Sequence, residues 1–94
     1  MWEVDLKLIE KWLDEQNDKT VLQILAALKR LEQEGPHLGR PLVDSVRGSA
    51  FKNMKELRPG SSGFSKIRIL FIFDPKRRAI LLVGGDKQQR WKRW

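Results

Sequence analysis

The architecture of this chain is set by the stretch Lys66-Ile67-Arg68-Ile69-Leu70-Phe71-Ile72-Phe73-Asp74-Pro75. From Ile69 to Phe73 every residue is β-branched, aromatic or leucine, which is typical of a strand buried on both faces. Asp74-Pro75 is a turn signal, and the apolar run that follows, Ala79 to Val83, ends at Gly84-Gly85. The sequence therefore predicts a central strand, Lys66 to Phe73, paired antiparallel with Ala79 to Val83.

A third strand is expected before the central one. Asn53 to Arg58 has strand character and is closed by Pro59-Gly60-Ser61-Ser62-Gly63, a composition typical of a loop. Residues 36–50 are rich in turn-forming residues and are expected to be a connector rather than a separate domain. The second half of the chain is thus predicted to be a three-stranded antiparallel meander.

Residues 1–35 have helical periodicity. Asn17 and Asp18 separate two apolar stripes and offer an N-cap for the second helix, and Gly35-Pro36 is a helix stop. A short edge strand is possible from Trp2 to Val4. The stripes are Leu6, Ile9, Trp12 and Leu13, and then Val21, Ile24, Leu25, Leu28 and Leu31. We predict an α+β fold in which an N-terminal helical hairpin packs on a small antiparallel β-sheet.

Length and composition exclude several classes of protein. The chain has 94 residues, which suits one domain, residues 1–94, with room for little more than one site. It has no cysteine, so disulfide frameworks and thiolate metal sites are excluded, and no metal or cofactor is expected. It has no apolar run long enough to span a membrane and no visible signal peptide, so a cytoplasmic location is expected.

The charge is strongly asymmetric. The chain carries a net charge of +7, yet residues 1–47 hold 7 Lys or Arg against 9 Asp or Glu, whereas residues 48–94 hold 12 against 3. The first half is therefore expected to be scaffold and the second half to be a surface for a polyanion. A basic protein that is merely soluble is the alternative.

Turn spacing suggests where the charges meet. A four-residue loop from Asp74 to Arg77 would set Phe73 opposite Arg78. Closing the other hairpin through Pro59–Ser65 would set Arg58 opposite Lys66. The same two registers place Arg68 opposite Val83 on one side and Glu56 on the other. The charged residues expected on one face, near Lys87, are Glu56, Arg58, Lys66 and Arg68.

Such a cluster suits phosphate, because cations hold an RNA backbone while a carboxylate orients an arginine or accepts a proton. A Glu56–Arg68 ion pair with solvated lysines is the structural alternative. Lys76-Arg77-Arg78, at the expected hairpin tip, is either an RNA contact or solubilising turn charge.

Four segments together resemble the RelE/ParE superfamily of type II toxin–antitoxin systems, and within it the HigB-like, phage-related toxins. They are Gly39–Asp44, Asn53–Pro59, Arg68–Phe71 and Leu82–Lys87. The resemblance covers nearly the whole chain and implies a RelE-like fold and a ribosome-dependent mRNA endoribonuclease. In that chemistry the 2′-hydroxyl of the RNA attacks without a metal. The implied partners are the ribosome, mRNA and a cognate antitoxin of helix-turn-helix type, in a toxin–antitoxin hetero-oligomer.

The resemblance also implies roles for residues. Arg68 matches the central-strand arginine that faces the scissile phosphate, and Lys87 stands where related toxins place a catalytic arginine. Arg58 is expected to position the phosphate. Glu56 is the first choice for the base, ahead of Asp86. The late Tyr or His of related toxins has no counterpart, since the chain has no Tyr and its one His, at position 37, lies in the loop before the sheet.

Further RNA contacts are expected from basic residues around the cluster and in the segment Gln88–Trp94, whose tryptophans alternate with cations. An amphipathic turn packed on the sheet is the alternative for that segment. The expected RNA-binding residues are Lys55, Lys66, Arg90, Lys92 and Arg93. Two alternative functions remain open, a ParE-like inhibitor of DNA gyrase without catalysis and a basic nucleic-acid-binding module.

Overall fold

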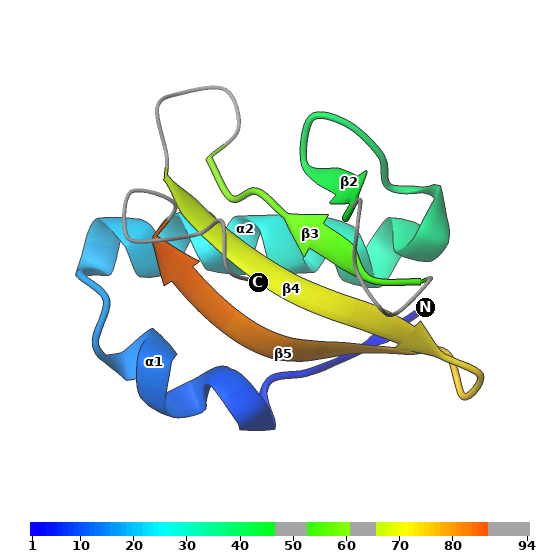
Figure 1. The fold of residues 1–94 in the computed structure, drawn as a ribbon, viewed down its shortest axis with the longest axis horizontal. Helices are drawn as coiled ribbons and strands as arrows, with labels where there is room; N and C mark the ends of the chain where they lie inside the picture. Colours follow the sequence, from blue (N-terminus) through cyan, green and yellow to red (C-terminus); the bar gives the residue numbers. More distant parts are fainter. Residues whose placement is uncertain (47–52, 61–65, 87–94) are drawn as a thin grey trace.

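The computed structural model of the protein describes residues 1–46, 53–60 and 66–86. One long helix lies across one face of a five-stranded sheet, so the predicted α+β class is confirmed (Figure 1). The elements in chain order are β1 (Glu3–Asp5), the 3-10 helix η1 (Lys7–Ile9), α1 (Glu10–Asp14), α2 (Asp18–Glu34), the 3-10 helix η2 (Gly35–His37), β2 (Val43–Ser45), β3 (Lys55–Leu57), β4 (Ile67–Asp74) and β5 (Arg78–Asp86).

The sheet has the strand order β1-β5-β4-β3-β2. The strands from β2 to β5 pair antiparallel, and β4 is central, as its apolar sequence predicts. The predicted three-stranded meander was too small. At one edge β1, which overlaps the edge strand anticipated from Trp2 to Val4, pairs parallel with β5. At the other edge the three-residue β2 lies within residues 36–50, which were expected to be only a connector.

The strand registers differ from the prediction. The β4–β5 hairpin loop has three residues rather than four, because Asp74 pairs with Arg78 and Arg77 takes the left-handed conformation, with φ 62°. An irregularity between Leu70 and Phe71 shifts the register once more, so Arg68 lies opposite Gly85. The β3–β4 register also differs from the predicted one, and it sets Glu56 opposite Leu70 and not opposite Arg68.

Helix α2 forms where the sequence predicts the second helix. The Asn17 side chain accepts a hydrogen bond from the Thr20 backbone N–H at 2.8 Å, so the expected N-cap is present. The helix ends at Gly35, whose φ of 53° suits glycine. Its buried face packs on the sheet, and no helix of the described residues is both long and apolar enough to cross a membrane. That face consists of Ile24, Ala27, Leu28 and Leu31.

The predicted helical hairpin is only partly present, because the first helix is short. Helix α1 has five residues and follows directly on η1. Its Trp12 packs against the core, and a Cβ on Gly84 would lie 2.5 Å from the Trp12 ring. The prediction that the strand ends at Gly84-Gly85 is therefore wrong, because β5 continues through both glycines to Asp86, and Gly84 lets an indole ring lie directly on the strand.

Candidate functional site

The face of the sheet away from α2, here called the distal face, carries charged residues from three adjacent strands. Residues directly opposite in a sheet share a face, and alternate residues along a strand do as well. Asp44 of β2 pairs with Glu56 of β3, Glu56 pairs with Leu70 of β4, and Arg68 lies two residues before Leu70. Arg58, which directly follows β3, belongs to the same face by alternation.

These residues form a continuous series of ion pairs, here called the arginine–carboxylate chain. Arg40 approaches Asp44 Oδ2 with Nε at 3.2 Å and Nη2 at 3.1 Å. Arg58 Nη2 lies 3.4 Å from the same oxygen and 3.1 Å from Glu56 Oε2, and its Nε lies 3.2 Å from Glu56 Oε2. Arg68 Nε lies 3.7 Å from Glu56 Oε1. The charges thus alternate from Arg40 to Arg68, with three cations and two carboxylates.

The arginine–carboxylate chain runs from solvent into the protein. The Arg40 side chain is 72% exposed, whereas Glu56 and Arg68 are 10% and 14% exposed. Arg68 Nη1 also donates to the backbone carbonyl of Ile67 at 2.7 Å, which fixes the direction of the guanidinium. Electrostatic interactions are stronger where water is excluded, so the Glu56–Arg68 end is the part best able to hold and orient charge.

Neighbouring groups and burial shift the pKa values of Asp44 and Arg68. The side-chain hydrogen bond from Arg40 lowers the pKa of Asp44 below its usual 3.8, and the Ser45 backbone N–H adds to this. Burial lowers the pKa of Arg68, with Arg58 acting in the same direction and Glu56 against it. An arginine nevertheless remains protonated in proteins, so Arg68 is a cation at neutral pH.

The structure brings together three of the four residues predicted to be catalytic. Glu56, Arg58 and Arg68 meet on the distal face, although the predicted registers were wrong. The fourth, Lys87, lies outside the described residues, as do the predicted RNA contacts Arg90, Lys92 and Arg93.

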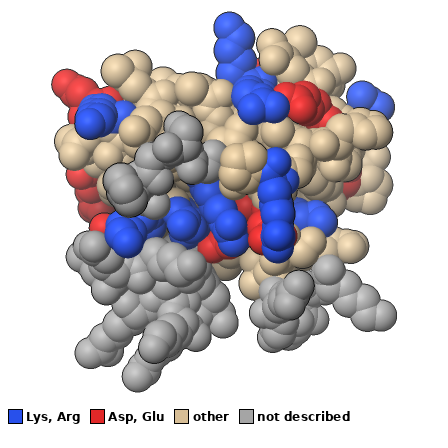
Figure 2. Space-filling model, turned by 90° about the horizontal axis from the view of Figure 1, so that it is seen from above, with Lys and Arg blue, Asp and Glu red and all other residues tan. Residues whose placement is uncertain are grey.

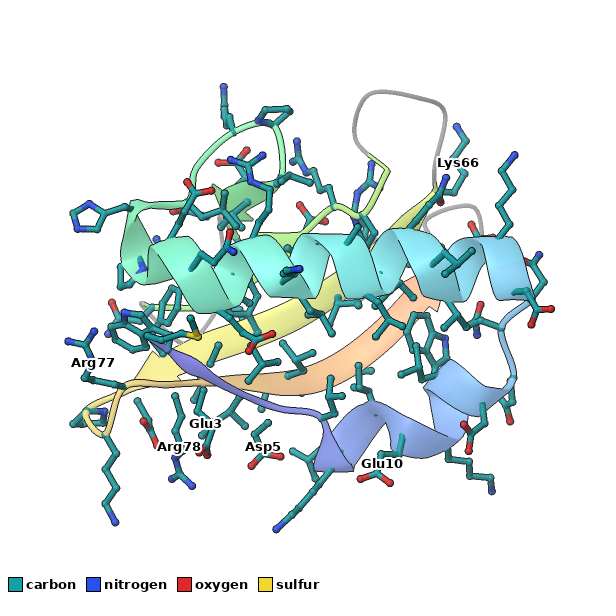
Figure 3. The ribbon with its side chains drawn as sticks, turned by 180° about the vertical axis from the view of Figure 1, so that it is seen from behind. Glu3, Asp5, Glu10, Lys66, Arg77 and Arg78 are labelled. Carbon is teal, nitrogen blue, oxygen red and sulfur yellow. The ribbon has the colours of Figure 1, made fainter. Side chains whose placement is uncertain are left out.

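Two predicted RNA contacts lie apart from the arginine–carboxylate chain. Lys66 is exposed and lies just before β4, at the end of the sheet away from Arg77 (Figure 3). Lys55 precedes Glu56 and so projects from the other face of β3, where its Nζ donates to Ser45 Oγ at 3.2 Å. The second choice for the base, Asp86, pairs with Ile67, whose side chain packs on the core at the helix side of the sheet. The register thus separates Asp86 from Glu56.

Sequence reasoning did not assign a role to Asp44 or Arg40. Both lie in Gly39–Asp44, one of the segments that carry the family resemblance, but this segment was expected to be a loop. The missing information was strand β2, which sets Asp44 opposite Glu56. A three-residue strand next to Pro41 gives little periodicity from which to infer this.

A second group of charges lies at the β4–β5 hairpin. Arg78 contacts Asp74 Oδ2 through Nε at 2.8 Å and Nη2 at 2.6 Å, which lowers the pKa of Asp74 and raises that of Arg78. The Arg77 guanidinium lies 5.1 Å from the centre of the Trp2 ring. Two of the three tip cations are therefore engaged by the fold itself, at the end of the sheet shown in Figure 3.

The arginine–carboxylate chain can bind an anion such as phosphate. Guanidinium groups form paired hydrogen bonds to phosphate oxygens, and here Glu56 accepts hydrogen bonds from Arg58 and lies in an ion pair with Arg68, whose direction the Ile67 carbonyl fixes. Figure 2 shows Lys and Arg gathered in a band across one side of the molecule, with Asp and Glu atoms among them. Fold and site together define a small basic α+β protein that presents arginines from one face of its sheet.

Comparison with known proteins places the chain more closely. Residues 11–94 match the family described as "Phage derived protein Gp49-like (DUF891)", and the chain belongs to this family. It is 55% identical over 93 residues to the Mycobacterium tuberculosis protein named "Putative toxin HigB2", covering 99% of this chain and 46% of that protein. It is 53% identical over 89 residues to "Putative toxin HigB3" of the same organism, covering 95% of this chain and 75% of that protein. The chain thus spans about half of the first relative and three quarters of the second.

Proposed function

We propose that the protein is the toxin of a type II toxin–antitoxin system and that it cleaves mRNA on the ribosome. The names of the two relatives support a toxin. The observation that carries the nuclease is the pair Arg58 and Arg68, held on either side of Glu56 on the distal face.

The proposed reaction is transesterification within the RNA. The 2′-oxygen attacks the adjacent phosphorus, the bond from phosphorus to the 5′-oxygen breaks, and the products are a 2′,3′-cyclic phosphate and a 5′-hydroxyl. Negative charge builds up on the phosphoryl oxygens in the transition state, and preorganised donors stabilise such charge strongly. In this proposal Arg68 and Arg58 are those donors.

Proton transfer requires an acceptor for the 2′-hydroxyl proton and a donor for the 5′-oxygen. We assign the acceptor to Glu56, the carboxylate that contacts both guanidinium groups. Lys87 follows the last residue of β5 and is proposed to stabilise or protonate the leaving oxygen. Lys66, Arg90, Lys92 and Arg93 are proposed to contact RNA outside the reaction centre.

The proposed partners follow from this activity. Ribosome and mRNA provide the substrate, and a cognate antitoxin, of helix-turn-helix type, silences the toxin in a hetero-oligomer. An acidic segment of the antitoxin would complement the basic second half of the chain, where 12 Lys or Arg face 3 Asp or Glu in residues 48–94. All of these partners are found in the cytoplasm.

The test is induced expression in a bacterium, with primer extension on a translated reporter message. Wild type, Arg68→Ala and the hairpin variant Arg78→Ala are compared at equal protein level. Codon-phased cuts in wild type and Arg78→Ala that vanish in Arg68→Ala support the proposal. Growth arrest with DNA damage and no cuts would replace it with gyrase inhibition. No arrest in any strain would leave a nucleic-acid-binding module.

A further inference from the structure

Lys55 lines a hollow that adjoins the exposed end of the arginine–carboxylate chain. The hollow has a volume of about 280 Å³ and lies between the segment that follows α2 and strands β2 and β3. Its walls include His37 and Arg40 from that segment, Ser45 from β2 and Lys55 from β3. The predicted RNA contact Lys55 therefore lies in the wall of this hollow, on the side of β3 away from Arg58.

The lining mixes apolar side chains with polar and charged ones. Leu38 and Val43 are buried, each 5% exposed, and Phe73 adds a half-buried aromatic ring. The charged side chains of the lining are Arg40 and Lys55, together with the carboxylate of Asp44, which pairs with Arg40. An aromatic surface beside cations favours a base joined to a phosphate.

The hollow adjoins the arginine–carboxylate chain through two shared residues. Arg40 and Asp44 line the hollow and also form the exposed end of the chain. Strand β2 is the edge of the sheet, so an RNA strand held by Arg58 and Arg68 can pass this edge without crossing a neighbouring strand. The two sites are therefore adjacent along a single path.

We propose that this hollow binds one nucleotide of the RNA that flanks the cleaved bond, and that Lys55 makes the toxin selective for sequence at that position. The inference rests on the proposed nuclease function and deepens it. The volume of about 280 Å³ lies just below the usual range of small-ligand pockets, which begins near 300 Å³, so the hollow suits a small unit of the RNA.

The test is to map the 5′ ends of cleaved message in cells that express wild type, Lys55→Ala or Lys55→Arg. Lys76→Ala is the matched control, since it removes an exposed lysine at the hairpin tip. We expect Lys55→Ala to keep cutting but to reduce the preference among flanking nucleotides about tenfold, the usual effect of losing one hydrogen bond to a charged group. Lys55→Arg should restore the preference, and Lys76→Ala should leave it unchanged.

An unchanged preference in Lys55→Ala, with wild type cutting normally, overturns the role of the hollow and leaves the nuclease proposal intact. Absence of cuts in wild type overturns both. Thermal unfolding of each variant shows whether it folds. If Lys55→Ala is unstable, Lys55→Gln gives the same comparison, because its amide can still reach the Ser45 hydroxyl that Lys55 contacts at 3.2 Å.

Discussion

Two groups of charged residues differ in how their partners are related along the chain. At the β4–β5 hairpin, Asp74 and Arg78 are four residues apart, and Asp74 also accepts hydrogen bonds from the backbone N–H groups of Lys76 and Arg78. On the distal face, Arg58 reaches Asp44 across fourteen positions, and Glu56 reaches Arg68 from one strand to the next. The first group is local and the second depends on the assembled sheet.

The difference separates charges that build the fold from charges available for a ligand. A carboxylate that accepts two backbone N–H groups and an adjacent arginine holds a turn in place, and the hairpin uses Asp74 in this way. In the arginine–carboxylate chain the cations outnumber the acids by three to two, so positive charge remains after pairing. The two groups should therefore respond differently to substitution.

The largest difference is expected in RNA cleavage. Arg58→Ala removes a proposed phosphate donor and breaks the link between Asp44 and Glu56. We expect cutting of a translated reporter to fall about 100-fold, the usual effect of removing one preorganised donor. Arg78→Ala removes an arginine that is held by Asp74 and should leave cutting within about twofold, as for a surface change away from the reacting atoms.

Primer extension on the same message measures cleavage by both variants. Growth of cells that express each variant without the antitoxin gives a second readout. Arg58→Lys is the control for charge alone, because lysine keeps the charge and loses the planar fork. Equal loss of cutting in Arg58→Ala and Arg78→Ala would contradict the distinction between the two groups.

The next largest effect is on stability. Glu56→Ala leaves Arg58 and Arg68, which both face this carboxylate, as like charges in a poorly solvated place. Removing one partner of a shielded ion pair destabilises proteins strongly, and we expect a loss of about 3 kcal/mol in the free energy of unfolding. Urea denaturation at neutral pH measures it. Glu56→Gln keeps the shape of the side chain and one acceptor, so it should lower the free energy of unfolding by less. An unchanged free energy of unfolding in Glu56→Ala would show that the arginine–carboxylate chain does not depend on its central carboxylate.

Acid should reduce the contribution of both groups of charges to the stability of the fold. The pKa values of Asp44 and Asp74 are lowered in the folded protein, chiefly by Arg40 and Arg78 respectively. Each carboxylate therefore stabilises the fold above its ordinary pKa of 3.8, and this contribution is lost as the pH falls below 3.8 through the lowered native value. We expect the urea midpoint to drop in that window. The drop should be shallower in Asp74→Asn and in Asp44→Asn. If the urea midpoint of either variant depends on pH as in wild type, that aspartate does not contribute to the acid sensitivity.

Much of the fold was predictable because its signals are local. The Asn17 cap, the Gly35 stop and the apolar run of β4 each act within a few residues, and each was placed correctly. The two edge strands were harder. β1 and β2 have three residues each and gain their stability from the neighbouring strand, so their own sequences show little of it.

The site was partly predictable for a geometric reason. The predicted register of β3 against β4 placed Glu56 opposite Arg68, whereas it lies opposite Leu70. That error is two residues, and side chains alternate with a period of two, so Glu56 and Arg68 remain on one face. What no spacing reveals is the bulge between Leu70 and Phe71 and the left-handed Arg77, which together set the β5 register.

The smallest effect is expected at Arg77, where two terms oppose each other. Its guanidinium lies over Trp2, an exposed contact that contributes about 0.5–1 kcal/mol. Its φ of 62° is a strained conformation for any residue with a Cβ, and the strain costs about 1 kcal/mol. Arg77→Ala loses the contact and keeps the strain, so unfolding should become easier by about 0.5–1 kcal/mol. Arg77→Gly loses the contact and relieves the strain, so it should match wild type within error.

Thermal unfolding compares the three proteins, and reporter cleavage should be the same in all of them. A glycine variant less stable than the alanine variant would mean that the hairpin depends on the side chain at position 77 and not on its backbone conformation.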